Sequence, residues 1–291
     1  MQELCHFNGK SVPVEDVSIS PRDLGFLRGY AVYDVMPVVN GEPFLFDEHW
    51  KRFERSASDL GLRPPVDAEA AREIARDLIR HHDYETMIVR TVLSGGPSGN
   101  GFLPEGNETF CVMIEETAPL PRELYDKGGK VITLGYRRTL PSSRTADFIV
   151  PLKERERKLA EGAVEILYVH GGRVLEASTS NFFIVKDGEI RTTGHGPRSG
   201  ITRNLIVRLA KGAGIPIREH GLFEDDLRSC DEAFLTASNK LIVPIVQVND
   251  FPIGKGEVGP VTKRLLSIFD GFIKSYGPDS DKNLPGESLS V

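Results

Sequence analysis

Cysteine and tryptophan are scarce in this sequence, and it contains no long apolar run. The three cysteines, Cys5, Cys111 and Cys230, are far apart and include no CxxC pair, so they predict free thiols in a reducing compartment and no metal site. No apolar stretch approaches the length of about 20 residues that crosses a bilayer. The segment 1–10 is polar and acidic where a signal peptide needs an apolar centre. The expected location is therefore the cytoplasm, with no membrane partner.

Charge of one sign is not concentrated anywhere along the chain. The formal net charge is −6, from 36 Lys and Arg against 42 Asp and Glu, and it is spread over the sequence. This distribution provides no electrostatic footprint for nucleic acid or for an anionic membrane. With 291 residues, of which 40% are hydrophobic, the chain can bury a large core, which we expect to be divided between two domains.

The order of the sequence patterns predicts where these domains lie. Asn8-Gly9 and Asn40-Gly41 separate short strand-forming runs, the pattern typical of hairpins, and two helical patterns follow at about 47–60 and 67–82. Pro119 and Pro121 interrupt the pattern, so we place a linker near 117–122. We expect a small N-terminal domain at 1–118, a larger one at 119–277, and a disordered tail at 278–291 because that segment is polar and rich in Pro and Gly.

Two segments offer groups that suit a phosphate. Residues 199–203 lead from a loop into a helix, so the free N–H groups of Ile201 and Thr202 and the helix dipole could hold an anion. His49 and Arg52 are three residues apart on another predicted helix and share one face, where the arginine fork suits phosphate. The alternatives are an ordinary helix cap for the first segment and a solvated helix face for the second.

Two further segments place polar groups at the ends of strand-forming runs. Glu176 is followed at once by Ser178, Thr179, Ser180 and Asn181. A carboxylate that faces a core needs a charged or protonated partner, whereas on the wet face of an alternating strand it needs none. The segment 236–239 ends an apolar strand, where ligand-binding loops of α/β domains are common, although an ordinary polar turn would have the same sequence.

Taken in order, these segments resemble the class IV aminotransferases, the family of branched-chain aminotransferase, D-amino acid aminotransferase and aminodeoxychorismate lyase. The resemblance extends to about residue 277 and is carried by SPRDLGFLRGYAVYDV (18–35), FDEHWKRF (46–53), AEGAVEILYV (160–169), RVLEASTSNFFIVKDGEI (173–190), SGITRNLIVRLA (199–210), DEAFLTAS (231–238) and GPVTKRLL (259–266). It implies an α/β fold with two domains, of fold type IV and D-amino acid aminotransferase-like, with the ligand site between them. It also implies a homodimer, pyridoxal phosphate as cofactor, and transfer of an amino group between an amino acid and a 2-oxo acid.

The resemblance assigns a role to each matching position. Arg52, with His49 behind it, would bind the cofactor phosphate together with Ile201, Thr202 and Ser238. Glu176 would pair with the pyridine nitrogen and keep it protonated, so that the ring acts as an electron sink. Tyr33 would line the substrate side, with Ala237 and Asn239 of the 236–239 turn. Arg90 resembles an arginine of the branched-chain enzymes that helps to recognise an acidic substrate, which favours the branched-chain type, although a structural salt bridge would equally explain it.

The sequence departs from the family at its catalytic lysine. Counting back from 160–167 and forward from 128–138 brings that position to Ser143 or Arg144, and neither is a lysine. A guanidinium stays protonated at ordinary pH and is no amine nucleophile, so Arg144 could neither form a Schiff base nor shuttle a proton.

Three interpretations of this departure remain. A lysine elsewhere could supply the amine, Lys240 beside the 236–239 turn or Lys153 farther along. The protein could instead bind pyridoxal phosphate or another anionic ligand without a Schiff base, with Arg144 as an anion-binding group. In the third interpretation, the local alignment is shifted or the residue was substituted, and the ancestral function is amino transfer.

Overall fold

The computed structural model describes residues 2–193, 200–278, 280 and 284. The chain separates into two compact units. The first consists of 1–118, 140–147 and 276–282, and the second consists of 119–139, 148–275 and 283–291. The predicted boundary at 118/119 coincides with a change of unit, whereas 140–147, which the sequence assigned to the second domain, belongs to the first unit.

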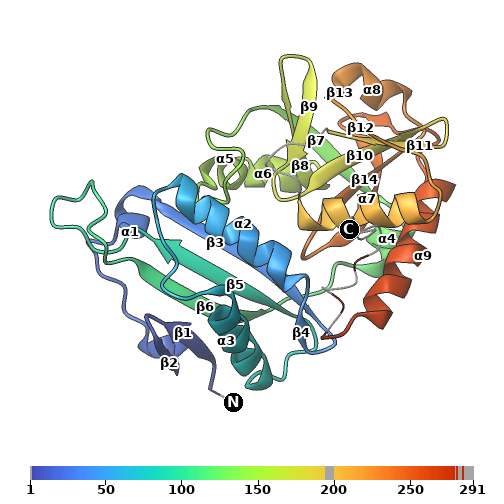
Figure 1. The fold of residues 1–291 in the computed structure, drawn as a ribbon. Helices are drawn as coiled ribbons and strands as arrows, with labels where there is room; N and C mark the ends of the chain where they lie inside the picture. The colour runs from blue at the N-terminus through green and yellow to red at the C-terminus, as the bar shows by residue number, and fades with distance from the viewer. Residues whose placement is uncertain (1, 194–199, 279, 281–283, 285–291) are drawn as a thin grey trace, which may run out of the picture. The chain divides into compact units, whose positions relative to one another are not determined.

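The first unit is built on a six-stranded sheet in the order β2-β1-β6-β5-β3-β4 (Figure 1). All neighbouring strands are antiparallel, and Asn8 and Asn40 have the positive φ angles that tight hairpin turns require. The strands are β1 (Leu4–Phe7), β2 (Lys10–Pro13), β3 (Ala31–Val39), β4 (Glu42–Pro43), β5 (Met87–Ser94) and β6 (Thr109–Glu116). A 3-10 turn (Val14–Asp16) and the short helix α1 (Leu24–Arg28) connect β2 to β3.

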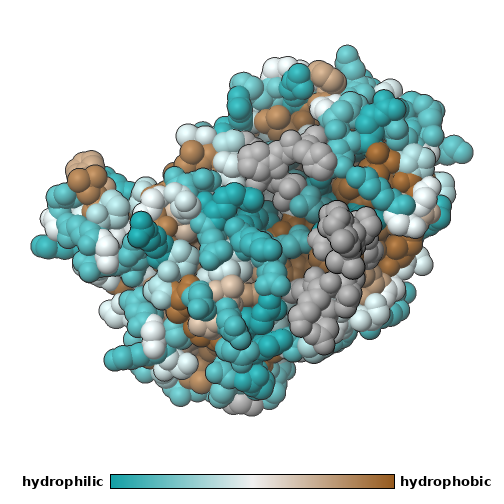
Figure 2. All heavy atoms as spheres, in the orientation of Figure 1, coloured by the Kyte–Doolittle hydropathy of each residue, from teal (hydrophilic) through white to brown (hydrophobic). Residues whose placement is uncertain are grey.

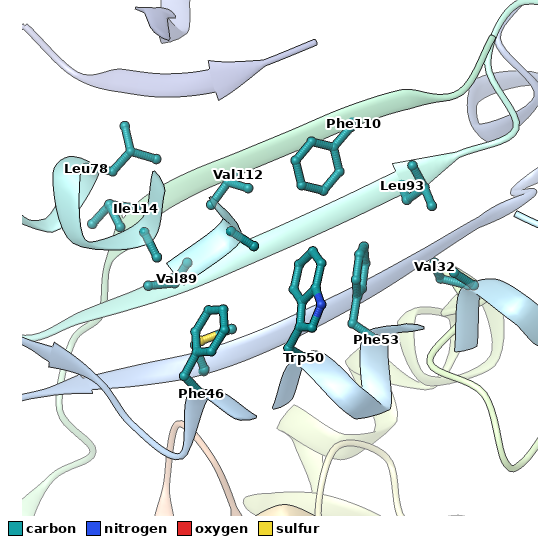
Figure 3. Packing of buried hydrophobic residues seen from close by; sticks show 14 of the residues in the cluster. Val32, Phe46, Trp50, Phe53, Leu78, Val89, Leu93, Phe110, Val112 and Ile114 are labelled. Carbon is teal, nitrogen blue, oxygen red and sulfur yellow. The ribbon is translucent and has the colours of Figure 1, made fainter. Parts of the chain in front are cut away.

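Helices α2 (Phe46–Asp59) and α3 (Ala68–Arg80) cover one face of this sheet. The spacing of Trp50, Phe53 and Ala57 puts them on one side of α2, where they join sheet residues such as Val89 and Phe110 in a buried core (Figure 3). Because side chains alternate along a strand, the odd-numbered residues of β3 point to the opposite face.

The segment 140–147 pairs with the beginning of β3. Val32 forms a β-bridge with Thr145, the Tyr33 amide donates to the Arg144 carbonyl at 2.9 Å, and the Ala146 amide donates to the Ala31 carbonyl at 2.9 Å. These backbone hydrogen bonds explain why the segment belongs to the first unit, although both of its chain neighbours belong to the second.

The second unit contains a larger mixed sheet in the order β12-β11-β10-β14-β15-β7-β8-β9-β13, with β16 paired to β15. The pairs β7–β8, β7–β15 and β11–β12 are parallel, and the others are antiparallel. Its strands are β7 (Gly129–Gly135), β8 (Ala163–His170), β9 (Arg173–Ala177), β10 (Asn181–Lys186), β11 (Glu189–Thr192), β12 (Ile217–Glu219), β13 (Leu222–Phe223), β14 (Glu232–Ala237), β15 (Leu241–Val248) and β16 (Phe251–Pro252).

The helices of the second unit include two long ones that pack on β14, namely α7 and α9. One face of this sheet carries the stacked rings of Phe183 and Phe234, whose centroids are 4.7 Å apart. The Glu232 carboxylate lies on the same face and accepts hydrogen bonds from the first amides of α9. The helices are α4 (Arg122–Lys127), α5 (Ile149–Lys153), α6 (Arg155–Ala160), α7 (Ile201–Gly212), α8 (Glu224–Ser229) and α9 (Pro260–Ser275).

The predicted disordered tail, 278–291, lies outside the described residues except for Pro278, Ser280 and Leu284. Within the described parts of the chain, every helix is too short or too polar to cross a membrane.

Candidate active site

The first unit contains a buried cluster of Asp34, His49 and Arg52 between β3 and α2. Arg52 Nε donates to Asp34 Oδ2 at 2.7 Å and Nη2 donates to Oδ1 at 2.8 Å, while His49 Nδ1 lies 2.6 Å from the same Oδ1. Asp34 and His49 are fully buried, and Arg52 is 8% exposed. The His49 and Arg52 face of α2 therefore points into the unit and is not a solvated helix face.

The charges of this cluster follow from its burial and its geometry. Burial alone would raise the pKa of Asp34, but the Arg52 guanidinium and His49 hold it well below its ordinary value. Burial lowers the pKa of His49, and the positive charges of Arg52 and Arg144 lower it further, against the effect of Asp34. His49 is thus neutral and donates from Nδ1 to the ionised Asp34. Its Nε2 atom is buried and has no hydrogen-bond partner among the described residues.

Arg144 belongs to the same unit as this cluster. Its amide donates to the Ser56 hydroxyl at 3.1 Å, and the neighbouring Ser143 hydroxyl donates to Asp59 at 2.6 Å, so the segment is held by α2 as well as by β3. Because the charge of Arg144 acts on buried His49, its guanidinium is within electrostatic range of the cluster. The position assigned to the family lysine is therefore close to the arginine assigned to the phosphate.

Tyr33 and Arg90 lie on the opposite face of the same sheet. Tyr33 pairs with Val92 and Val35 pairs with Arg90 across β3 and β5, which places all four side chains on the face away from α2 and α3. Arg90 forms two hydrogen bonds with Glu115, from Nε at 2.5 Å and from Nη2 at 2.9 Å. The salt bridge that the sequence allowed for Arg90 is present.

In the second unit, Glu176 lies near the end of β9 and is half-buried. Arg138 is its cationic neighbour, with Nε 3.5 Å from Oε1. Arg138 also donates to the Ser178 carbonyl at 2.5 Å and lies over the Tyr168 ring. The carboxylate thus has the charged partner that a half-buried position requires.

The N-terminus of α7 lies at Gly200, and no side-chain cap is present there among the described residues. Its first N–H groups, those of Ile201, Thr202 and Arg203, have no acceptor within the helix. An added Cβ at Gly200 would lie 2.0 Å from Asn181 Oδ1, so a larger residue here would require the Asn181 side chain to move. The preceding Ser199 lies outside the described residues.

Thr236 is the residue of β14 that pairs with Asn181. It is 1% exposed, and its hydroxyl has no hydrogen-bond partner in the described part of the chain. Since Asn181 contacts Gly200, this unpaired hydroxyl and the start of α7 lie near one another. In the turn that follows, Ala237 is buried, Ser238 is half-buried and Asn239 is exposed.

Lys240 ends this turn and binds Glu165, a buried carboxylate of β8. Its ammonium also donates to the Thr179 hydroxyl at 2.8 Å. Burial would raise the pKa of Glu165, but Lys240 and the hydroxyls of Ser178 and Thr179 hold it below its ordinary value. The ammonium of Lys240 is therefore engaged in neutralising a buried charge. Lys153, the other lysine considered from the sequence, is exposed at the end of α5.

Three residues of these clusters were missed by the sequence reasoning: Asp34, Arg138 and Glu165. Asp34 could have been found because Val32 and Met36 share its face, which predicts a carboxylate pointing into the core. The other two gave a weaker signal, since a single charge on a strand or in a loop is common at a protein surface.

Comparison with known proteins agrees with these features. The model of the amino-transferase class IV family matches residues 31–248. This range contains Arg52, Arg144, Glu176 and the start of α7, as well as most of both sheets. The chain belongs to the class IV aminotransferase family, and the family and fold predicted from the sequence motifs are confirmed.

Similar proteins include aminotransferases with two different substrates in their names. D-alanine aminotransferase of Staphylococcus aureus is 28% identical over 279 residues, covering 94% of this chain and 99% of the relative. A branched-chain amino acid aminotransferase of T.th., solved with pyridoxamine 5'-phosphate, has a TM-score of 0.87 at 27% identity and covers 97% of both chains. The same T.th. enzyme, complexed with N-(5'-phosphopyridoxyl)-L-glutamate, also has a TM-score of 0.87.

Proposed function

We propose that this member of the class IV aminotransferases binds pyridoxal phosphate without a covalent bond to lysine and moves an amino group between an amino acid and a 2-oxo acid. The observation that carries the proposal is the family match over 31–248, in which residue 144, our candidate for the lysine position, is an arginine. Relatives solved with pyridoxamine 5'-phosphate or a phosphopyridoxyl ligand support the cofactor.

The described residues fit a phosphate in both units. In the first unit, Nε and Nη2 of Arg52 donate to Asp34, which holds the guanidinium in one orientation. Nη1 of Arg52 has no hydrogen bond among the described residues. In the second unit, no side chain among the described residues caps the N–H groups at the start of α7, and the buried Thr236 hydroxyl has no hydrogen-bond partner among them. Backbone N–H groups, a hydroxyl and a guanidinium are the donors that phosphate oxygens accept from. We propose Arg52 and His49 of the first unit, and Ile201, Thr202 and Ser238 of the second unit, as the phosphate-binding residues that the family resemblance implies.

Glu176 is our candidate for the pyridine nitrogen. The cofactor, when bound, supplies an electron sink that stabilises negative charge at the substrate carbon. A carboxylate paired with the ring nitrogen would favour its protonated form, and Arg138 is a cationic partner that would orient Glu176. We place Tyr33, Ala237 and Asn239 on the substrate side.

Arg144 would supply charge and no amine. Its guanidinium remains protonated and can bind an anionic oxygen, but it cannot act as a nucleophile. Without a lysine bond the cofactor is held only by hydrogen bonds and charges, so it should exchange with free cofactor in solution. A second candidate function is binding of pyridoxal phosphate or another anion without catalysis. Arg144 favours it, because a guanidinium binds anions but is no amine nucleophile.

The test is an absorbance spectrum with added pyridoxal phosphate, followed by borohydride reduction and peptide mass mapping. Cofactor bound without an adduct, and lost on dialysis, is the expected result. Arg144→Lys should then give a reducible adduct at residue 144, whereas Arg137→Lys, a matched change at a nearby exposed arginine, should not. Absence of any cofactor binding would refute the proposed function.

The same mapping examines the two native lysines. An adduct at Lys240 or Lys153 in the wild-type protein would show a relocated amine and contradict non-covalent binding. Lys240→Arg distinguishes the two roles of Lys240, because arginine preserves the ion pair with Glu165 but cannot form the adduct. Amino transfer itself would be measured with an apolar amino acid and a 2-oxo acid, and its absence in a protein that binds the cofactor would support the second candidate.

We further propose a homodimer that forms through the first unit. Phe26 of α1 is 75% exposed and Phe102, in the loop between β5 and β6, is 73% exposed, with Leu27 and Leu103 as their exposed chain neighbours. Arg28 holds this loop, since it donates to the Gly101 carbonyl and lies over the Phe102 ring. Figure 2 shows hydrophobic atoms on the projecting loop beside α1 of Figure 1. Exposed apolar patches of this kind mark interfaces between proteins.

The cytoplasm remains our proposed location. The three cysteines are free and buried, an arrangement that suits a reducing compartment.

A further inference from the structure

Two turns of the second unit lie at the same end of its sheet, on neighbouring strands. The turn 178–180 leads into β10 at Asn181, and Asn181 pairs with Thr236 near the end of β14, which continues into the turn 238–240. The Asn181 side chain also lies against Gly200, where α7 begins. The two turns therefore flank the place where the buried Thr236 hydroxyl has no partner, and the first amides of α7 no side-chain cap, among the described residues.

One buried carboxylate, that of Glu165 on β8, binds groups of both turns. Its two oxygens accept hydrogen bonds from the hydroxyls of Ser178, Thr179 and Ser180, the last at 2.9 Å. The Thr179 amide donates to it at 3.1 Å. From the other turn, the Lys240 ammonium binds Glu165 and donates to the Thr179 hydroxyl at 2.8 Å. The two turns are thus joined through the side chains of Glu165 and Lys240.

The ion pair is anchored at its carboxylate end. The Glu165 side chain is 2% exposed, whereas that of Lys240 is 20% exposed. A carboxylate buried to this degree needs a counter-charge and hydrogen-bond donors in place of water. Lys240 supplies that counter-charge, so the turn from which it comes is tied to the interior of the second unit.

The backbone of the 238–240 turn needs such an anchor. Leu241, the first residue of β15, has a φ of 58°, in the left-handed region that leucine rarely adopts. A conformation of this kind persists only where the surrounding structure holds it. Lys240 is held at two points, because its ammonium binds Glu165 and its carbonyl accepts from the Tyr125 hydroxyl at 3.1 Å. These contacts keep the turn in its observed shape.

We infer that the ion pair of Glu165 with Lys240 is a positioning clamp, which fixes both turns beside the start of α7 and so orders the phosphate end of the ligand site before a ligand arrives. This inference rests on the proposed function, in which Ser238 and the first amides of α7 bind the cofactor phosphate. A site that is ordered in advance loses less conformational entropy on binding. Such order matters in this chain, because a cofactor without a lysine bond is held only by hydrogen bonds and charges.

The clamp can be opened by substitutions at either residue. Glu165→Gln removes the negative charge at nearly constant shape, and Lys240→Met removes the positive charge, whereas Lys240→Arg preserves the ion pair. Glu232→Gln is the matched control, because Glu232 is a buried carboxylate at the other end of β14 that accepts from the amides of Val261 and Thr262 at 3.0 and 2.7 Å. Both carboxylate substitutions should lower the melting temperature, but Glu232→Gln leaves the two turns untouched.

The experiment combines two measurements on the full chain. Hydrogen–deuterium exchange of the ligand-free protein is read on the peptide that contains 237–241, where the Lys240 amide donates to the Ala237 carbonyl at 3.3 Å and makes no contact with Glu165. An absorbance titration gives the dissociation constant for pyridoxal phosphate. Glu165→Gln and Lys240→Met should speed exchange in this peptide and weaken cofactor affinity at least about fivefold. Lys240→Arg and Glu232→Gln should match the wild type in both measurements.

Three results would overturn the inference alone. One is exchange in the 237–241 peptide that Glu165→Gln leaves unchanged. Another is a cofactor affinity that Glu165→Gln weakens no more than Glu232→Gln does. The third is a Lys240→Arg protein that binds the cofactor as weakly as Lys240→Met, because the charge pair would then not be what holds the turn. A wild type that binds no pyridoxal phosphate would refute the proposed function and this role of the clamp together, and the wild-type titration shows that before any variant is compared.

Discussion

The guanidinium of Arg52 and the carboxylate of Asp34 meet edge to edge, with two hydrogen bonds of 2.7 and 2.8 Å in a buried position between β3 and α2. This pair fixes the orientation of Arg52 and uses two of its three nitrogens. It also balances the charge of a cluster in which His49 is neutral, so removing either partner would leave an uncompensated buried charge.

Asp34→Asn should destabilise the protein by about 3–5 kcal/mol, because it leaves the buried Arg52 charge without a counter-charge. Such a loss is a large part of the stability of an ordinary domain. Urea unfolding followed by circular dichroism measures it. Asp77→Asn is the control, since Asp77 pairs with Arg80 on the exposed surface of α3 and its loss should change stability little. Equal effects of the two substitutions would contradict the structural role of Asp34.

The stability of the protein should fall between pH 7.5 and 5.5 in part because of His49. Burial and the charges of Arg52 and Arg144 lower the pKa of His49 in the folded state, against the attraction of Asp34. As the pH falls through the unfolded-state value of about 6.5, the unfolded chain binds a proton that the folded state refuses, so unfolding becomes more favourable. Asp34 adds no slope in this window, because its lowered pKa affects stability only below about pH 4.

His49→Gln should therefore lose less stability than the wild type over this pH range. The measurement is the urea midpoint at pH 7.5 and 5.5. His81→Gln, at an exposed position on the C-terminal side of α3, should keep the wild-type dependence. A His49→Gln protein with the same pH dependence as the wild type would show that folding does not lower the pKa of His49.

Thr236→Val should stabilise the ligand-free protein by roughly 1 kcal/mol, because it removes a buried hydroxyl that has no hydrogen-bond partner among the described residues. If that hydroxyl faces the phosphate, the same substitution should weaken binding of pyridoxal phosphate about fivefold. Thr262→Val is a matched control: its hydroxyl is also buried and unpaired, but it lies in the first turn of α9. Thr262→Val should raise the melting temperature without changing cofactor affinity, and an equal change of affinity in both variants would contradict the assignment.

Sequence patterns predicted the parts of the fold that depend on local periodicity. The α2 helix was found because its apolar residues recur at helical spacing, and the β1–β2 and β3–β4 turns because Asn-Gly favours them. The route of 140–147 could not be found in this way. Its pairing with β3 joins residues more than 100 positions apart, and a single sequence carries no local signal for such a pairing.

In the candidate site, too, local motifs could be read from the sequence, whereas contacts between distant residues could not. Arg52 and Glu176 were proposed from motifs, since their neighbours in the sequence identify the family. Their partners, Asp34 and Arg138, were missed because a partner is defined by distance in space. Lys240 was singled out for its place beside a turn, but its ion pair with Glu165 depends on the registry of β8 against β15 through β7, which the sequence alone does not fix.

The pairing of 140–147 with β3 also affects the order in which the protein can fold during synthesis. When the ribosome has made residues 1–118, β3 and α2 are complete, but the segment that pairs with the beginning of β3 has yet to be synthesised. Tyr276, whose hydroxyl accepts from the Leu45 amide at 2.7 Å, emerges only after nearly all of the second unit. The first unit is therefore translated first but completed only after most of the second unit has been made. Until then, the edge of β3 that pairs with 140–147 is open to other strands of the nascent chain.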